Sequence, residues 1–363
     1  MELTKEIAYK FIKDFFRDKS LLFLGTGASC AVDPAFGMPA LKDVLSEQVP
    51  EKISGATQKT EWGKVQKAFQ NDEGLESALN KVLSQGLVAE ITRITGAFIA
   101  SLDRKYSLLI SNREQEWPAR NLLQKLVNNL PEGDRALNVV TPNYDLMMEY
   151  VCDTYDIPYI NGFVGCVQKK IDWNVANRQV LYPDKIISRN RSKTVYKFKK
   201  HIRLYKVHGS LNYFFHNGDV IENSAWMWNP PGFAERVMIT PGIEKYEGLQ
   251  KFREELLKKA NEAIRKEGSF LFIGYGFNDK HLEEYINRKL EYFQCPGLIV
   301  TKDSNSRIDA LLEKAPNLWL VCRKPETGNE STFVYNRKFP AGLYINDKKL
   351  WDINEFTDEI LGG

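Results

Sequence analysis

The sequence is poor in the residues that bind metals or form disulfide frameworks. Its 363 residues include five cysteines and four histidines, and no two cysteines form a C-x-x-C pair. The odd number and wide spacing of the cysteines indicate neither a zinc knuckle nor a set of disulfides. Because scattered free thiols are typical of a reducing compartment, we expect a cytoplasmic protein without a metal site.

Long apolar runs and an excess of charge of one sign are also absent. Residues 1–6 are charged and lack the apolar stretch of a signal peptide. The most apolar helical stretch, residues 87–110, is interrupted by charged side chains, which argues against a membrane span. With 50 basic and 47 acidic residues, the net charge is only +3. No general attraction to nucleic acid or to a membrane follows.

Short apolar strands alternate with helical stretches along most of the chain. With 43% hydrophobic residues, the chain can fill a sizeable core. The alternation predicts an α/β fold with a Rossmann-like, mostly parallel sheet and helices on both faces. The expected strands are 21–24, 137–141, 203–207, 236–240, 269–273, 297–301 and 318–322.

Two stretches interrupt this Rossmann-like core, which we expect at residues 1–50 and 131–325. Residues 51–130 carry apolar side chains at helical spacing and predict a helical insertion. Residues 155–202 look irregular and form a variable basic insertion. Within and just beyond it, residues 185–206 include no acidic residue, which favours a solvated hairpin or a protein docking face over a nucleic-acid site. Residues 326–363 are expected to be a C-terminal extension.

Four of the expected strands end in glycines or polar residues. The first runs into Gly25-Thr26-Gly27-Ala28-Ser29, the second into Asn143 and Asp145, the third into His208, and the fourth into Gly274-Tyr275-Gly276 and Asn278. Ligands of open α/β sheets bind outside the carboxyl ends of the strands, so we expect these ends to form one pocket. Singly, each also fits a structural role, as a tight turn, a helix cap or a packed histidine.

The glycine turn departs from the dinucleotide-binding turn of dehydrogenases. That turn requires G-x-G-x-x-G, and here Cys30 occupies the position of the third glycine. An ordinary dehydrogenase is therefore a poor fit.

Together and in this order, the segments resemble the sirtuin (Sir2-like) family. The family's Gly-Ala-Gly-x-Ser is similar to residues 25–29, its Gly-Ile-Pro to Gly37-Met38-Pro39, its Thr-Gln-Asn-x-Asp to residues 141–145, and its His-Gly to His208-Gly209. Residues 274–279 are similar to a variant seen in bacterial Sir2-like proteins. The four zinc cysteines of sirtuins are absent. In this the chain resembles the zinc-free NAD-consuming effectors of bacterial antiphage defence.

The resemblance implies that NAD is the substrate, with no metal, and that Asn143 and His208 are the catalytic residues. Cleavage of the bond between nicotinamide and ribose passes through an oxocarbenium-like state, which requires an oriented ribose and water. The Asn143 amide suits that orientation, and His208 suits a general base near neutral pH. The residues expected to bind NAD are Gly25, Thr26, Gly27, Ala28, Ser29, Pro39, Asp145, Gly274, Tyr275, Gly276, Asn278 and Asp303.

We therefore expect an NAD glycohydrolase that acts as a regulated effector of antiphage defence. An unregulated enzyme would deplete the NAD of its host, so we expect a homo-oligomer or a protein partner. The resemblance suggests a HerA-type ATPase or a short Argonaute, with nucleic acid involved only indirectly. Three alternatives stay open: an NAD-dependent protein deacylase, a non-catalytic scaffold that binds NAD or ADP-ribose, and a nuclease or DNA-binding activity centred on residues 185–206.

Overall fold

A nine-stranded sheet forms the centre of the molecule, in the order β16-β15-β14-β13-β12-β1-β2-β8-β3. The computed structural model describes residues 2–71, 73–188, 191–238, 247–324, 331–346 and 348–362. The strands from β14 to β3 run parallel to one another. Strand β15 pairs antiparallel with β14, and β16 pairs antiparallel with β15. The predicted α/β fold with a mostly parallel sheet is confirmed. The strands are β1 (Leu21–Leu24), β2 (Ala136–Thr141), β3 (Tyr159–Ile160), β8 (His201–Lys206), β12 (Phe270–Ile273), β13 (Gly297–Thr301), β14 (Leu318–Arg323), β15 (Thr332–Asn336) and β16 (Phe339–Ile345).

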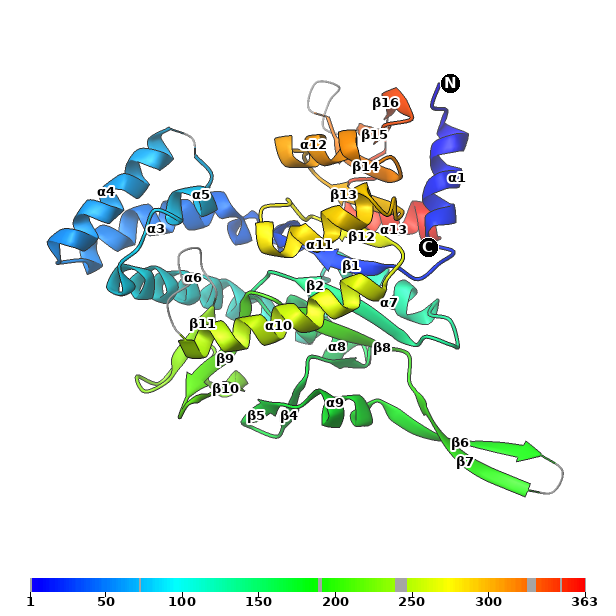
Figure 1. Cartoon of the computed structure of the whole chain (residues 1–363), viewed down its shortest axis with the longest axis horizontal. Coiled ribbons are helices and arrows are strands. Elements are labelled where there is room, and N and C mark those ends of the chain that lie inside the picture. The colour runs from blue at the N-terminus through cyan, green and yellow to red at the C-terminus, as the bar shows by residue number, and fades with distance from the viewer. Residues whose placement is uncertain are drawn as a thin grey trace.

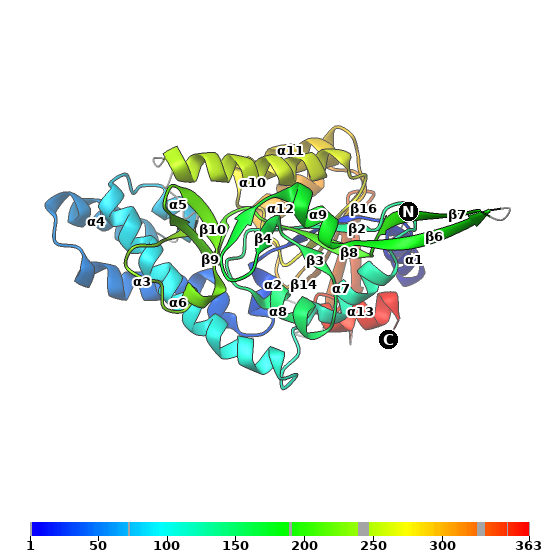
Figure 2. The same cartoon turned by 90° about the horizontal axis from the view of Figure 1, so that it is seen from below.

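Helices cover both faces of this sheet (Figures 1 and 2). One face carries α10 (Glu247–Lys266), α11 (Lys280–Glu291) and α12 (Ser306–Lys314). The other carries α1 (Lys5–Phe15), α7 (Ala119–Asn128), α8 (Met147–Thr154) and α13 (Ile353–Leu361). Side chains of a strand alternate between the faces: Leu21 and Phe23 of β1 join the first core, and Leu22 and Leu24 join the second.

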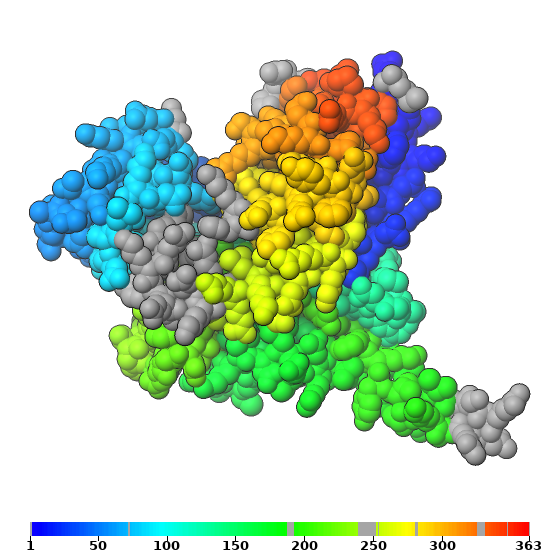
Figure 3. Space-filling model, viewed as in Figure 1, coloured from blue at the N-terminus to red at the C-terminus, as the bar shows by residue number. Residues whose placement is uncertain are grey.

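A helical lobe stands beside the sheet, where the helical insertion was predicted (Figure 1). It contains α3 (Met38–Lys52), α4 (Ala56–Gln70), α5 (Leu75–Leu79) and the first half of α6 (Gln85–Ser111). Apolar side chains of all four helices share one buried cluster, so the lobe has a core of its own. Helix α3, which we expected in the Rossmann-like core, packs into the lobe. Figure 3 shows a notch between this lobe and the side of the body formed by α11 and α12.

A second sheet is antiparallel, in the order β11-β9-β10-β5-β4. The prediction that the strand at 236–240 continues the parallel series is wrong, because β11 pairs antiparallel with β9. A short strand with two buried residues fits either kind of sheet, so its sequence does not decide the pairing. Residues 239 and 240 lie outside the described part of the chain. The strands are β4 (Phe163–Gly165), β5 (Lys169–Ile171), β9 (Gly209–His216), β10 (Asp219–Glu222) and β11 (Glu235–Met238).

Residues 155–202 are more regular than predicted. Strand β3 joins the main sheet, β4 and β5 join the second, and α9 (Trp173–Gln179) follows. Then β6 (Leu181–Ser188) and β7 (Arg191–Phe198) form a hairpin whose strands pair only with each other, and Figures 1 and 2 show it projecting from the body. We call it the basic arm. This agrees with the hairpin interpretation of the basic segment, and its partner stays a prediction.

The expected C-terminal extension is built into the main sheet. Strand β15 pairs with β14, β16 pairs with β15, and α13 packs on one face with Phe356 fully buried. Residues 331–362 therefore complete the core.

Candidate active site

The polar strand ends predicted from the sequence lie at one edge of the main sheet. Strand β1 lies between β2 and β12, and β2 pairs with β8. Strands β2 and β8 thus lie on one side of β1, and β12, β13 and β14 lie on the other. This reversal of the strand order at β1 creates the switch point where such sheets bind ligands. Asn143 and His208 each lie two residues beyond a paired position at the end of β2 and β8, Thr141 and Lys206. They therefore leave neighbouring strands at the same edge.

The two glycine turns at this edge pack directly against each other. Gly25 N–H donates to the Ile273 carbonyl at 2.9 Å, Gly27 N–H to the Gly274 carbonyl at 3.0 Å, and Ala28 N–H to the Gly25 carbonyl at 3.0 Å. Gly274 has φ +57°, in the left-handed region. Glycine at positions 25, 27 and 274 therefore allows the backbones of the two turns to approach closely. Phosphate binding by these three N–H groups stays a prediction, and it would require their present hydrogen bonds to open.

Gly25→Ala is expected to destabilise the fold. A Cβ at this position would lie 2.2 Å from the Gly274 carbonyl oxygen and 2.5 Å from Tyr275 Cα, both backbone atoms that cannot rotate away. The expected loss in the free energy of unfolding is about 1–3 kcal/mol or more, measured by chemical denaturation. Gly63→Ala is the matched control, because no atom lies within 4 Å of a Cβ in that helix and alanine favours helix. Equal stability of the two variants would contradict the steric argument.

Asn143 is held by a small hydrogen-bond network. Its Nδ2 donates to the Gly25 carbonyl at 3.0 Å and to Ser29 Oγ at 3.2 Å. Ser29 Oγ in turn donates to Asp145 Oδ2 at 2.8 Å, and both of these side chains are buried. Asn143 Oδ1 is buried and has no hydrogen-bond partner among the residues that the structure describes. Because a buried acceptor without a donor is costly, this oxygen is positioned for a ligand hydroxyl or a water.

His208 pairs with a carboxylate from the fourth strand end. Its Nε2 lies 2.6 Å from Asp279 Oδ2, and the side chains are 19% and 11% exposed, so the pair is only partly open to solvent. Asp279 Oδ1 also accepts from Leu282 N–H at 3.2 Å, which caps α11. A carboxylate that accepts from Nε2–H fixes the ring and leaves Nδ1 as the basic nitrogen.

Two further acidic residues lie in the electric field of this pair. Burial raises the pKa of Glu76, on α5 of the lobe, and the charge of Asp279 adds to this effect. The charges of His208 and Arg307 lower it. Burial raises the pKa of Glu283, on α11, to about 7, although Arg307 opposes that shift. Glu76 is therefore close enough to His208 and Asp279 for their charges to act on its carboxyl group.

Buried charges support the loop that carries Asn143. Lys206 Nζ lies 2.8 Å from Glu149 Oε1 and donates to the Asp145 carbonyl at 2.6 Å; the lysine side chain is 0% exposed, so water cannot solvate it. Burial raises the pKa of Glu149 against the opposing charge of Lys206. Asp103 of α6 accepts from Leu146 N–H at 2.8 Å. The loop is thus fixed from the sheet and from the second half of α6.

The other predicted ligand-binding residues are more scattered. Pro39 is exposed in the first turn of α3, and Asn278 is exposed before α11. Tyr275 is buried, and its hydroxyl has no hydrogen-bond partner. Asp303 Oδ1 accepts from Arg323 Nη2 at 2.7 Å, so its carboxylate is already engaged. Their roles stay predictions, as does that of Thr26, the first residue of the short helix α2 (Thr26–Cys30).

The sequence interpretation missed two residues of the site. Asp279 lies in the segment that resembles bacterial Sir2-like proteins but was not among the predicted site residues. The structure shows that its carboxylate both caps α11 and contacts His208. Glu76 had no local signal at all, because its place depends on how the lobe folds against the sheet. Only the position of Asp279 after a strand end pointed to the site.

Two negative findings apply to the described residues. No three histidine, cysteine, aspartate or glutamate side chains among them come together in a way that would hold a metal ion. None of their helices has both the length and the apolar character needed to cross a membrane.

The chain was compared with protein-family models, curated proteins and solved structures. A family model described as a SIR2-like domain matches residues 137–318, half of the chain. A solved structure from work on the mechanism and regulation of Sir2 enzymes matches with 10% sequence identity and a TM-score of 0.39, over 85% of this chain and 90% of that one; a score this low adds nothing to the family match. No curated protein matches. The chain therefore belongs to the SIR2-like domain family.

Proposed function

We propose that the chain is an NAD glycohydrolase, which converts NAD to nicotinamide and ADP-ribose. One observation carries the proposal: the buried, unpartnered Oδ1 of Asn143 lies at the same strand edge as the His208–Asp279 pair. Membership of the SIR2-like family supports NAD as the substrate. An orphaned acceptor beside a partly open base fits a substrate that presents hydroxyl groups, as the ribose of NAD does.

Asn143 is suited to orient the substrate. Gly25 and Ser29 occupy its amide donors, so the side chain cannot rotate freely and its oxygen stays in one position. A fixed acceptor can hold a ribose hydroxyl or the attacking water in a reactive geometry. Nicotinamide leaves as a neutral molecule, so the residues need to supply positioning and a base, and no strong acid.

His208 is suited to act as that base. Asp279 accepts from Nε2, which orients the ring and stabilises the imidazolium when Nδ1 takes a proton from water or from a ribose hydroxyl. The side chain keeps 19% of its surface exposed, enough to be reached by substrate. Glu76, whose pKa is raised by burial, adds a protonatable group whose charge interacts with that of His208.

We further propose that the activity is regulated and serves antiphage defence. The sequence resembles zinc-free effectors of that kind, and an enzyme that is always active would deplete the NAD of its own cell. The control is expected in a homo-oligomer or in a protein partner, with a HerA-type ATPase or a short Argonaute as candidates. The basic arm, with its exposed Ile186 and Tyr196, is a candidate surface for such a contact.

Incubation of the purified protein with NAD tests the proposal, alone and with the proteins encoded beside it. We expect nicotinamide and ADP-ribose in equal amounts, identified by mass spectrometry. Formation of O-acetyl-ADP-ribose only when acetyl-lysine peptide is present would favour a deacylase. Thermal stabilisation by NAD without products in any mixture would favour a scaffold and overturn the proposal.

A further inference from the structure

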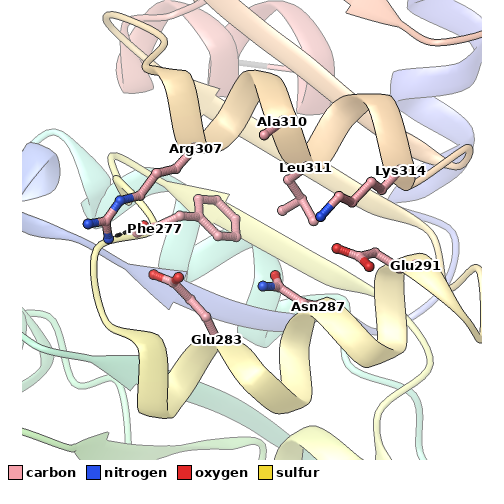
Figure 4. A pocket seen from close by; sticks show the side chains of 8 residues that line it. All are labelled: Phe277, Glu283, Asn287, Glu291, Arg307, Ala310, Leu311 and Lys314. Atoms are coloured by element: carbon pink, nitrogen blue, oxygen red, sulfur yellow. Dashed lines mark hydrogen bonds between the residues drawn. The ribbon is translucent and has the colours of Figure 1, made fainter.

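A pocket lies between the facing sides of α11 and α12 (Figure 4). Its volume is about 270 Å³. Its lining runs from Glu283 to Glu291 along α11 and from Arg307 to Lys314 along α12, with Phe277 at its base. Because it follows the two helices to their last residues, it is a groove on a face of the molecule rather than part of the strand-end site.

The two walls of the groove carry opposite charges. Figure 4 shows the carboxylates of Glu283 and Glu291 on the α11 side, and Arg307 and Lys314 on the α12 side. In the part of the chain that the structure describes, no ion pair joins the two walls. Charges that face each other without pairing leave room for a ligand that carries both signs.

The α11 wall presents two buried acceptors that lack donors. Glu283 is 8% exposed, and no described residue donates a hydrogen bond to its Oε1. Asn287, one helical turn further, likewise has a buried Oδ1 without a partner. Both side chains line the groove, and the two residues lie on one face of the helix. Since unpaired buried acceptors are costly, a ligand with several N–H donors would stabilise this wall.

The base of the groove is apolar, and the Arg307 guanidinium on its α12 side makes few hydrogen bonds. Phe277 and Leu311 line this part of the groove and are almost fully buried, at 2% and 5% exposed. Arg307 Nη1 donates to the Phe277 carbonyl at 3.1 Å, where the Phe277 backbone has φ +54°. Among the described residues this is the one hydrogen bond of the Arg307 guanidinium, which leaves donors for an anionic group.

We propose that this groove binds a free α-amino acid with an apolar side chain, of the leucine or phenylalanine kind. Its ammonium group would donate to Glu283 and Asn287, and its carboxylate would accept from Arg307. The apolar side chain would lie along Leu311 and Phe277. The site does not depend on the proposed reaction with NAD.

Titration calorimetry of the whole protein with L-leucine and L-phenylalanine tests this site. We expect saturable binding of at least one of them at millimolar concentration. Leucinamide, which lacks the carboxylate, and 4-methylpentanoate, which lacks the ammonium group, are expected to bind roughly tenfold or more weakly, because each loses charged hydrogen bonds. NAD is not in the mixture, so a failure here is distinct from a failure of the proposed reaction.

Two variants assign the binding to the groove. Glu283→Gln and Arg307→Gln are each expected to weaken binding roughly tenfold or more. Arg307 is exposed, so its variant keeps the fold even if the buried Glu283 position tolerates change poorly. Glu284→Gln, the exposed neighbour on α11, is the matched control and should bind as the parent does. The proposal is overturned if neither amino acid binds, or if both groove variants bind as tightly as the parent.

Discussion

Replacing His208 by alanine is expected to slow the release of nicotinamide from NAD by about 10²–10⁴-fold, the usual contribution of a positioned general base. His208 pairs with Asp279 at 2.6 Å and lies at the strand edge that also carries Asn143. The fold should stay intact, because the His208 side chain is partly exposed and lies beyond the last residue of β8. Initial rates of nicotinamide formation, measured on protein with an unchanged thermal transition, check this.

Asn143→Ala is also expected to slow the release of nicotinamide from NAD by about 10²–10⁴-fold. It removes the fixed acceptor at Oδ1. It also removes the Asn143 donor to Ser29 Oγ and one of the two donors to the Gly25 carbonyl, which keeps its hydrogen bond from Ala28 N–H, at a cost of about 1 kcal/mol in stability. His216→Ala is the matched control, since that ring packs against Trp226 and Phe233, on the second sheet. Turnover near the parent rate in both site variants would refute the catalytic assignment.

Lys206→Met is expected to destabilise the protein by about 3–5 kcal/mol. The lysine side chain is 0% exposed and its Nζ bonds Glu149 and the Asp145 carbonyl, so methionine would leave a buried carboxylate without its counter-charge. Glu149 would then have to bind a proton or admit water. The free energy of unfolding from urea denaturation measures the loss.

The double variant Lys206→Met/Glu149→Leu separates charge from packing. It removes both charges, so most of the lost stability should return. Lys193→Met, at an exposed position on the basic arm, is the matched control and should change stability by less than about 0.5 kcal/mol. If Lys206→Met is as stable as the parent, the buried pair does not hold the loop in the way described.

The sequence predicted the strand ends well because their signals are local. An apolar strand followed by glycine, asparagine or histidine is visible within ten residues, and parallel strands then place those ends at one edge. Sheet membership is not local. The segment at 236–238 has the composition of a buried strand, and only its partner β9 decides that it is antiparallel.

Roles that depend on distant partners escaped the sequence. Gly25 and Gly27 suggested a phosphate-binding turn, yet the structure shows them in contact with Gly274, and both explanations require glycine. Asp279 has the signature of a helix cap, which hides its contact with His208. Glu76 comes from the lobe, and nothing near it in the sequence indicates that the lobe folds against the strand ends.

The basic arm stands clear of both hydrophobic cores, since β6 and β7 pair only with each other. A two-stranded ribbon adds little stability of its own, so its loss or redesign costs the rest of the molecule little. Changes in the length and charge of this ribbon are therefore expected to leave the chemistry at the sheet edge intact. Tolerance to insertion should be concentrated there.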